Sequence, residues 1–501
     1  RPLFAKTYGA TTLGIDGRII DVEVDVSPGL PGFELVGLPD TSVKESKERV
    51  RTAIRNSGIQ LRQERVTVNL APADVRKDSS GLDLPIAVGL LASYGMVPEA
   101  AVQNALFSAE LSLDGNCRPI SGILPMAITA REHGLTEFYV APSNADEALL
   151  IDGLKVYAVE NLAQLVRHLA GTEKLTPAVP HSTEQKTDAA FTDDFADVQG
   201  QYQAKRALEI AAAGGHNVLM VGVPGSGKTM LARRMSSILP ELTKEEAIEI
   251  TKIYSISGLL GKDTGLVTTR PFRSPHHTSS TVAMIGGGSI PRPGEVTLAH
   301  HGVLFLDELP EFSKKTLEVL REPLEDNRIL ISRVNSKVEY QTKFIFVAAQ
   351  NPCPCGNLFS KNLTCTCSLN DIRRYKNTIS APLLDRIDIY VAMDETGADD
   401  RSDVCSEEMA DAVLRAFRAQ KARGQSELNA KLRDEETEKF CVCESAAREI
   451  LQTAITRYDL SQRGVNKTLK LARTIADLAG AEIIAKAHIL EALSFRIRSE
   501  I

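Results

Sequence analysis

Eight consecutive residues near the middle of the chain have the types and spacing of a loop that binds the phosphates of a nucleotide. They run from Gly222 to Thr229 with the sequence GVPGSGKT. The glycines let backbone N–H groups turn inward around the phosphates, Lys228 reaches the terminal phosphates, and the Thr229 hydroxyl is placed to hold Mg²⁺. The expected nucleotide-binding residues of this loop are Gly222, Pro224, Gly225, Ser226, Gly227, Lys228 and Thr229. This pattern predicts a nucleotide hydrolase.

A pair of adjacent carboxylates follows later in the chain. Asp307 and Glu308 come directly after the apolar residues 302–306, which are expected to form a buried strand. In phosphoryl transfer, one carboxylate at a strand end beside the phosphate loop helps to hold Mg²⁺, and a neighbouring one polarises the attacking water. We therefore assign Asp307 to Mg²⁺ and Glu308 to the water. The alternative is a buried strand that ends in two solvated acids, which the phosphate loop disfavours.

Three further residues would complete the catalytic set of Glu308, Asn351, Arg386 and Arg473. Asn351 follows the apolar residues 343–350 and would orient the water or touch the terminal phosphate, although an Asn in this place is often a turn residue. Arg386 would act on a neighbouring subunit's nucleotide, where such an arginine is worth about 10³ to 10⁵ in rate. Arg473 ends a run of three cations at spacings of three and would sense the phosphate, unless the run is an ordinary basic helix face.

Four of the eight cysteines form a tight group of two Cys-x-Cys pairs. They are Cys353, Cys355, Cys365 and Cys367. Four thiolates are a common ligand set of structural Zn²⁺. A disulfide pair is the alternative, which a reducing compartment disfavours, and an iron–sulfur cluster is a smaller one. We expect a zinc loop that stiffens the exit from Asn351 and presents Lys361, Arg373 and Arg374 to DNA.

Hydrophobic periodicity indicates the elements that must position these residues. A strand at 217–221 leads into the phosphate loop, and a helix at 230–239 leads out of it. Nearer the N-terminus, residues 19–26 and 65–70 alternate like half-buried strands, and 42–54 and 84–91 are expected to be helices. A C-terminal helical bundle is expected from the stretches 408–423, 437–457, 467–479 and 487–496. Cys441 and Cys443 fall in the second stretch and are expected to be core or surface thiols.

A chain of 501 residues is long enough for about three domains. We expect an α+β domain at 1–171, a linker at 172–193, an α/β nucleotide-binding core at 194–395 and a helical lid at 396–501. The net charge of −7 argues against a wholly basic nucleic-acid coat but not against a basic channel. No apolar run reaches the roughly 20 residues that span a bilayer, so we expect a cytoplasmic protein without a membrane partner.

Longer strings in the chain resemble one protein family. They are GGHN at 214–217, RPFRSPHH at 270–277, AMIGGG at 283–288 and LFLDELPEF at 304–312. With the phosphate loop, these strings resemble the magnesium-chelatase-like branch of the AAA+ ATPases, and within it the ComM (YifB) family, over essentially the whole chain. The resemblance implies an α/β multidomain fold: a Lon-protease-like α+β N-terminal domain, an AAA+ P-loop NTPase core with a parallel sheet, and a C-terminal helical lid.

The resemblance also implies a function. It points to a hexameric ATP hydrolase that uses ATP and Mg²⁺ as a DNA helicase or translocase, promoting branch migration in homologous recombination during natural transformation. Its partners would be single-stranded and branched DNA, further copies of the chain and recombination proteins. Two alternatives stay open: a chelatase-type motor that drives metal insertion with partner subunits, and a nucleotide-switched scaffold. Glu308 and Arg386 disfavour the scaffold, because a switch has little use for both.

Five residues are candidates for DNA contact. Relatives carry a hairpin before the Asn351 strand, and here its tip would present Arg333 and Lys337 to the phosphate backbone. A second insertion would contribute Arg273, His276 and His277. The alternative for the hairpin is a solvated turn.

The Lon likeness raises a peptidase hypothesis, which the residues disfavour. Gly81 or Leu82 falls where the nucleophilic serine is expected, and residues 119–125 contain no lysine to serve as its base. Ser79 and Ser80 without a neighbouring base are expected to be loop hydroxyls. The N-terminal domain is therefore expected to be proteolytically inactive.

Overall fold

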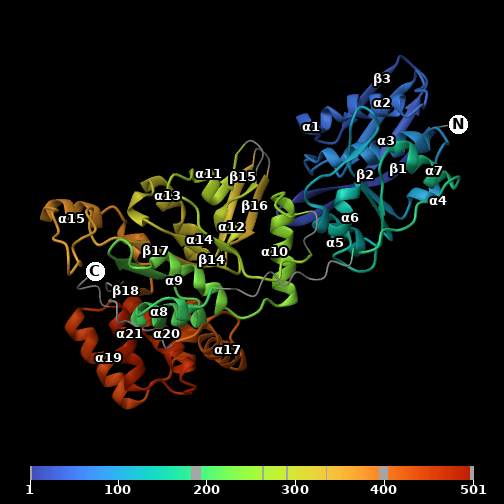
Figure 1. Ribbon diagram of the computed structural model, residues 1–501. Coiled ribbons are helices and arrows are strands. Elements are labelled where there is room, and N and C mark those ends of the chain that lie inside the picture. The colour runs from blue at the N-terminus through green and yellow to red at the C-terminus, as the bar shows by residue number, and fades with distance from the viewer. Residues whose placement is uncertain are drawn as a thin grey trace. The chain divides into compact units, whose positions relative to one another are not determined.

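The computed structural model of the protein divides into two compact units (Figure 1). It describes residues 3–181, 193–261, 265–288, 292–333, 336–393 and 404–496. The first unit comprises residues 1–186, 244–267 and 332–338, and the second comprises 187–243, 268–331 and 339–501. Most of the expected linker, 182–192, lies outside the described residues. The domain boundaries expected from the sequence stay predictions.

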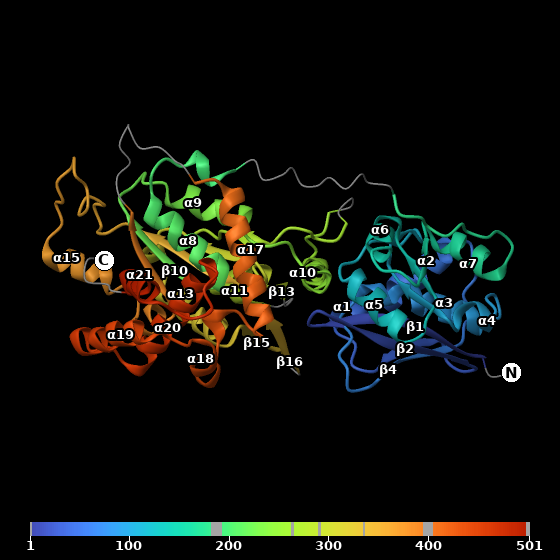
Figure 2. The same ribbon diagram turned by 90° about the horizontal axis from the view of Figure 1, so that it is seen from below.

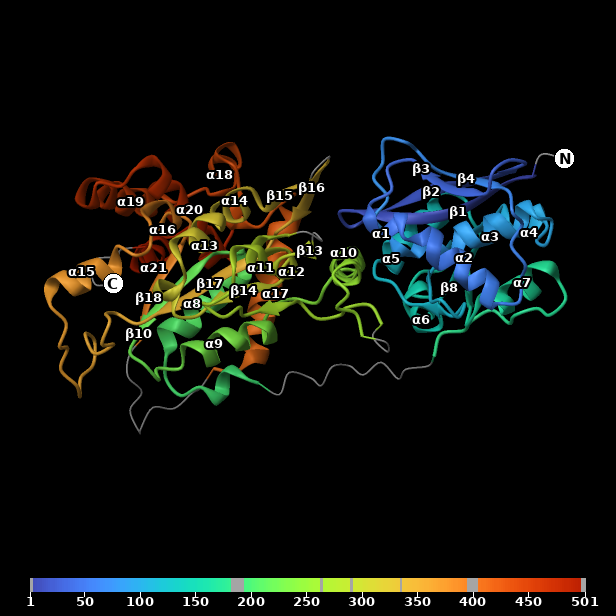
Figure 3. The same ribbon diagram turned by 90° about the horizontal axis from the view of Figure 1, so that it is seen from above.

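The first unit is built around a mixed sheet of seven strands. In spatial order these are β3 (Gly32–Val36), β4 (Arg65–Ala71), β2 (Asp16–Ser27), β1 (Leu3–Leu13), β5 (Ala105–Ser108), β8 (Glu137–Val140) and β9 (Lys155–Ala158). Figure 3 shows β4, β2 and β1 side by side. Alternate residues of β2 and β4 are buried, which confirms the strands expected at 19–26 and 65–70.

Helices cover both faces of this sheet. Leu106 and Phe107 are consecutive in β5, so their side chains point to opposite faces, and they belong to different apolar clusters. The cluster of Phe107 includes residues of α2 (Ser46–Asn56) and α3 (Asp83–Ser93). Helix α3 confirms the helix expected at 84–91, whereas the one expected at 42–54 is two helices, α1 (Thr41–Lys44) and α2, divided at Glu45. The cluster of Leu106 includes residues of α5 (Ile123–Glu132) and α6 (Ala145–Ala148).

Helix α10 (Lys244–Ile256) also packs in the first unit, although it follows the phosphate loop in the chain. Its Ser255 carbonyl accepts a hydrogen bond of 3.1 Å from the N–H of Gly122, the residue before α5. Lys252 of the same helix lies 3.4 Å from the carboxylate of Asp16. Together, these contacts attach α10 to the start of α5 and to β2.

The second unit contains a five-stranded sheet in which all neighbours are parallel. Its spatial order is β11 (Phe272–Arg273), β14 (Val303–Leu306), β17 (Ile345–Gln350), β10 (Val218–Gly222) and β18 (Ile389–Met393). Strands β10, β14 and β17 are buried along their whole length, because helices and lid residues cover the sheet. Parallel strands end at the same edge of a sheet, so the residues after these three strands lie close together.

The C-terminal residues form a helical bundle, as expected. Its helices are α17 (Ser406–Ala422), α18 (Asp434–Phe440), α19 (Ser445–Tyr458), α20 (Gln462–Leu478) and α21 (Lys486–Arg496). Figure 2 shows α17, α20 and α21 near α8 (Tyr202–Gly214), and α17 and α20 pack directly on it. None of the described helices is long and apolar enough to cross a lipid bilayer.

The expected single helix at 437–457 is wrong, because it is interrupted at Cys441–Cys443. Cys443 and Ile484 pair in parallel like strands: the N–H of Ile484 donates to the carbonyl of Val442, and the N–H of Glu444 donates to the carbonyl of Ile484. Cys441 and Cys443 are buried and Val442 is exposed, which is the alternation of an extended segment.

Candidate nucleotide site and cysteine cluster

The phosphate loop joins β10 to helix α9 (Lys228–Arg234), as the sequence predicts. Gly225 and Gly227 have φ of +78° and +93°, a region that residues with a side chain rarely adopt. The Lys228 ammonium is turned into the loop, where it donates to the carbonyls of Gly222 and Val223 at 2.8 and 3.0 Å. Burial lowers the pKa of Lys228, and the charges of the nearby acids only partly oppose this. The loop therefore holds its cation inside the curve that would surround the phosphates.

The Thr229 hydroxyl meets the first predicted carboxylate. It donates to Asp307 Oδ2 at 2.9 Å, which joins the start of α9 to the end of β14. A hydroxyl and a carboxylate are hard oxygen ligands of the kind that hold Mg²⁺ beside a phosphate loop. The two side chains therefore fit the Mg²⁺ role expected of them.

The second carboxylate, Glu308, has a constrained backbone and an exposed side chain. Its φ is +52°, and its N–H donates to Asp307 Oδ1 at 2.8 Å. His277 Nε2 lies 3.6 Å from Glu308 Oε2, and the imidazole also makes an edge contact with Phe312. The sequence placed His277 among the DNA contacts and gave no sign that it reaches Glu308.

Asn351, which follows β17, lies where the sequence places it. Its Oδ1 accepts a hydrogen bond of 3.3 Å from the Lys228 ammonium. Tyr375 was not expected at this site: burial raises its pKa to about 12, and the Asn351 N–H bonds to the phenol. The structure thus brings Lys228, Thr229, Asp307 and Asn351 together at one edge of the sheet.

Arg386 lies away from this group. Its guanidinium pairs with Glu325 at 2.7 Å and faces a pocket of about 870 Å³. The pocket is also lined by Lys431, Lys467 and Lys470 of the C-terminal region. Arg386 thus lies apart from the phosphate loop of its own chain. Its action on the nucleotide of another copy stays a prediction.

The other predicted catalytic arginine, Arg473, is buried inside the helical bundle. It donates to the carbonyls of Ala481 and Glu482 at 2.6 and 2.8 Å, and it lies 3.1 Å from the Asp477 carboxylate. Burial lowers its pKa. These contacts give the phosphate-sensing role of Arg473 no support, and that role stays a prediction.

The GGHN string has a structural role that the sequence did not reveal. Asn217 accepts the N–H of Phe346 at 3.0 Å and donates to the carbonyl of Arg386 at 2.9 Å. His216 bonds to Thr474 of α20 at 2.7 Å. A Cβ on Gly214 would lie 2.3 Å from the Thr474 hydroxyl, so only glycine fits there. The string connects β10, β17 and the segment of Arg386 to the lid.

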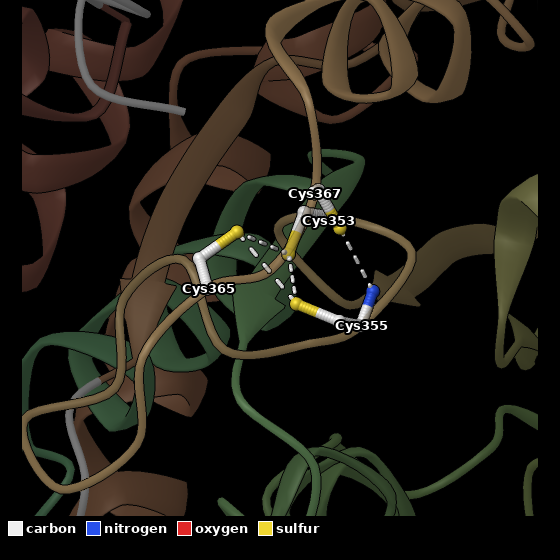
Figure 4. A group of neighbouring side chains, drawn as sticks. All are labelled: Cys353, Cys355, Cys365 and Cys367. Carbon is white, nitrogen blue, oxygen red and sulfur yellow. Dashed lines mark hydrogen bonds between the residues drawn. The ribbon is translucent and has the colours of Figure 1, made fainter.

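The four predicted cysteines converge, each sulfur within 4.8 Å of the others (Figure 4). Cys353 Sγ is 3.4 Å from Cys355 Sγ and 3.8 Å from Cys365 Sγ, and the last two are 3.6 Å apart. Tetrahedral ZnS₄ has Zn–S bonds of about 2.3 Å and hence sulfurs about 3.8 Å apart. All eight cysteines are free, which disfavours the disulfide. This spacing has room for one ion but not for several irons with bridging sulfides.

The N–H groups of Asn357 and Thr366 lower the pKa of the Cys355 thiol to about 6. Backbone donors that stabilise a thiolate favour metal ligation, because the ligand is the deprotonated form. For Cys367 the N–H of Cys355 lowers the pKa, but burial and the neighbouring thiols outweigh it and raise the pKa to about 12, so the fit to Zn²⁺ rests on the sulfur spacing.

The predicted DNA-contact residues that the structure describes contact other residues of the protein or solvent. Arg273 makes a two-point pair with Glu295 at 2.7 and 3.0 Å, and His276 bonds to Thr278 at 2.8 Å. The expected hairpin is present as β15 (Arg328–Arg333) and β16 (Ser336–Gln341), with Lys337 exposed. The side chain of Arg333 and the tip residues 334–335 lie outside the described part of the chain.

Matches to known protein families and relatives cover nearly the whole chain. Three family models match: Magnesium chelatase, subunit ChlI at residues 194–401, Subunit ChlI of Mg-chelatase at 22–144, and the ChlI C-terminal model at 403–496. The competence protein ComM of Haemophilus influenzae is 41% identical over 98% of this chain and 97% of its own length. YifB of Escherichia coli is 42% identical over 97% of this chain and 95% of its own. The chain belongs to the ComM/YifB family of magnesium-chelatase-like AAA+ ATPases.

Membership of this family agrees with the phosphate loop and the parallel sheet of the second unit, and it implies ATP and Mg²⁺. A weaker match, to Lon protease 2 of Bacillus subtilis, is 24% identical over 30% of each chain.

Proposed function

We propose that the protein is an ATP-dependent DNA motor of the cytoplasm, a helicase or translocase that promotes branch migration during natural transformation. One observation carries the ATPase part: Lys228, Thr229, Asp307 and Asn351 converge beside an exposed Glu308. The competence relative supports the DNA part of the proposal, because it covers almost the whole chain.

The residues of the site have separate tasks in hydrolysis. Lys228 binds the terminal phosphates, and Thr229 with Asp307 would hold Mg²⁺. When bound with ATP, Mg²⁺ neutralises charge that develops on the phosphates. Asn351 orients the attacking water, and Glu308 accepts its proton; the exposed carboxylate has the freedom to reach it.

A complete site would need a second copy of the chain. Arg386 pairs with Glu325 and lines a pocket apart from its own phosphate loop, which supports a role at a neighbour's nucleotide. A closed ring, a hexamer in this proposal, supplies such an arginine to every site. ATP turnover should therefore rise with assembly.

DNA binding would affect the ATP site through the insertion that carries His277. This residue lies 3.6 Å from Glu308, and its neighbour His276 is exposed. Lys337 on the hairpin would add a phosphate contact without sequence preference. DNA bound at the insertion would shift His277 and with it the Glu308 carboxylate.

A chelatase-type motor is the second candidate, because the three matching family models all describe chelatase subunits. ATP hydrolysis by such a motor would be indifferent to DNA. This difference separates the two candidates.

The decisive measurement is steady-state ATP hydrolysis with no DNA, with single-stranded DNA and with a four-way junction. We expect stimulation by DNA, loss of binding and turnover in Lys228→Ala, and binding without turnover in Glu308→Gln. Turnover of the wild-type protein that ignores all DNA forms contradicts the motor and favours the chelatase function.

We also propose a structural Zn²⁺ bound by Cys353, Cys355, Cys365 and Cys367, supported by the sulfur spacing. Metal analysis of the purified protein tests it, with about one zinc per chain expected.

The first unit, we further infer, has a Lon-protease-like fold without peptidase activity. The Ser79 hydroxyl accepts the N–H of Gly81 at 3.2 Å, so it acts as a local cap. Asp83 is buried in an ion pair of 2.7 Å with Arg49. Neither contact provides a general base that could activate a serine as the nucleophile of a peptidase.

A further inference from the structure

We propose that the four-cysteine loop positions the phosphate loop, so that zinc binding at the cluster sets the affinity of the protein for nucleotide. This inference rests on the proposed zinc site and goes beyond a structural role for the metal. Both loops belong to the second unit.

The first contact lies between Gly356 and Pro224. Gly356 follows Cys355 and has φ of +82°, and a Cβ placed on it would lie 2.7 Å from Pro224 Cγ and 2.8 Å from Cδ. Gly356 therefore rests its backbone directly on the ring of Pro224. Pro224 belongs to the phosphate loop, so any shift of the cysteine loop presses on the phosphate-binding backbone.

The second contact passes through Asn351. Its side chain accepts from the Lys228 ammonium at 3.3 Å, and it stands two residues before the buried Cys353. Its N–H bonds to Tyr375, which belongs to α15 (Leu369–Lys376), the helix after Cys367. The segments that enter and leave the cluster thus both reach Asn351.

The cluster joins these two segments. The N–H of Cys355 donates to Cys367 Sγ at 3.3 Å, and Cys365 Sγ lies within 3.8 Å of both sulfurs of the first pair. A metal bond at four sulfurs would fix residues 353–367 as one closed loop. The residues of this loop form neither helix nor strand, and its turn hydrogen bonds, Gly356 to Cys353 and Ser360 to Asn357, are local, so the cysteines connect its two ends.

The experiment uses the full-length chain, with fluorescent mant-ADP and Mg²⁺ as the probe. Cys365→Ser and Cys367→Ser remove ligands whose sulfurs contact the first cysteine pair rather than the phosphate loop. We expect less than about 0.2 zinc per chain in these variants. We also expect mant-ADP to bind about tenfold more weakly, because displaced phosphate-loop N–H groups would lose phosphate contacts worth about 1.4 kcal/mol.

Two further variants separate coupling from misfolding. Gly356→Ala keeps all four cysteines, so it should keep its zinc and still bind mant-ADP more weakly. Adding Pro224→Ala removes the two ring atoms that the new methyl meets, and affinity should partly recover. The matched control is Cys405→Ser, a free cysteine outside the cluster, which should leave zinc and affinity unchanged.

The outcomes distinguish the two proposals. Wild-type protein without stoichiometric zinc overturns the zinc site. Variants that lose zinc and keep wild-type mant-ADP affinity overturn the coupling and leave the zinc site standing. Gly356→Ala with wild-type affinity also overturns the coupling, because the Pro224 contact would then transmit nothing.

Discussion

Glu308 carries the chemical step in the proposed mechanism, and its surroundings show how that step is controlled. The residue is exposed, and the imidazole of His277 lies 3.6 Å from it. Replacement of His277 by alanine removes this neighbour and leaves the carboxylate free to adopt unproductive positions. We expect kcat to fall by about tenfold with little change in nucleotide affinity, because general-base catalysis contributes about 10² to 10⁴ and a misoriented carboxylate loses part of it.

His276→Ala is the matched control for His277. It removes the neighbouring imidazole, which stacks on His277 at 4.1 Å but bonds to Thr278. We expect a smaller loss of kcat, and His277→Gln should restore part of the rate as a hydrogen-bond donor. Equal losses in both alanine variants would contradict a specific role for His277.

The individual residues differ in how well the sequence predicts them. Lys228, Thr229, Asp307 and Asn351 follow strands of one parallel sheet, so local pattern and topology together place them. Arg473 is different, because a spacing of three identifies a helix face but does not say what packs on that face. In the structure, that side chain is 1% exposed and is surrounded by lid carbonyls.

At the scale of elements, Asn217 connects strands whose pairing cannot be recognised from the sequence, although each strand alone can. Its side chain holds the N–H of Phe346 and the carbonyl of Arg386. Asn217→Ala leaves the buried N–H unpaired, which costs about 1–3 kcal/mol. We expect lower thermal stability and weaker ATP turnover in the assembled protein, since Arg386 loses its support.

Asn466→Ala provides the comparison for this prediction. Asn466 lines the same pocket as Arg386, and its side chain donates to Asp434 at the surface. The change should cost less than about 0.5 kcal/mol. Differential scanning calorimetry measures both variants, and similar melting temperatures would show that Asn217 is not a structural junction.

The elements also show where the local sequence pattern fails to predict secondary structure. The strands at 19–26 and 65–70 were predictable because alternate residues are buried. The break between α18 and α19 was not, because it depends on Cys443 pairing with Ile484, which is remote in the chain. The Cys-Val-Cys alternation was the available signal, but it is too short to outweigh the helical pattern on both sides.

For the whole molecule, the main feature that sequence could not supply is the packing of helix α10. Nothing in its local pattern distinguishes a helix of the nucleotide-binding core from one that packs on α5. Near this helix lies Glu147 of α6, whose Oε2 is buried. Burial raises its pKa to about 7, although the Ser255 hydroxyl of α10 and the N–H groups of Leu124 and Ile123 oppose the shift.

The raised pKa of Glu147 makes the stability of the first unit depend on pH. The folded carboxyl takes up its proton near pH 7 and the unfolded one near about pH 4.3, so between these values the folded state binds more protons. Its contribution to stability is therefore fully present below about pH 4.3 and is lost as the pH rises through 7, by about 4 kcal/mol in total. Glu147→Gln, which is neutral at every pH, should flatten this dependence, whereas Glu132→Gln at the exposed end of α5 should keep it. Hydrogen exchange of residues 145–148 and 244–256 at pH 5.5 and 8 measures the effect, and equal pH dependence in the wild-type and Glu147→Gln chains would contradict a buried protonated carboxyl.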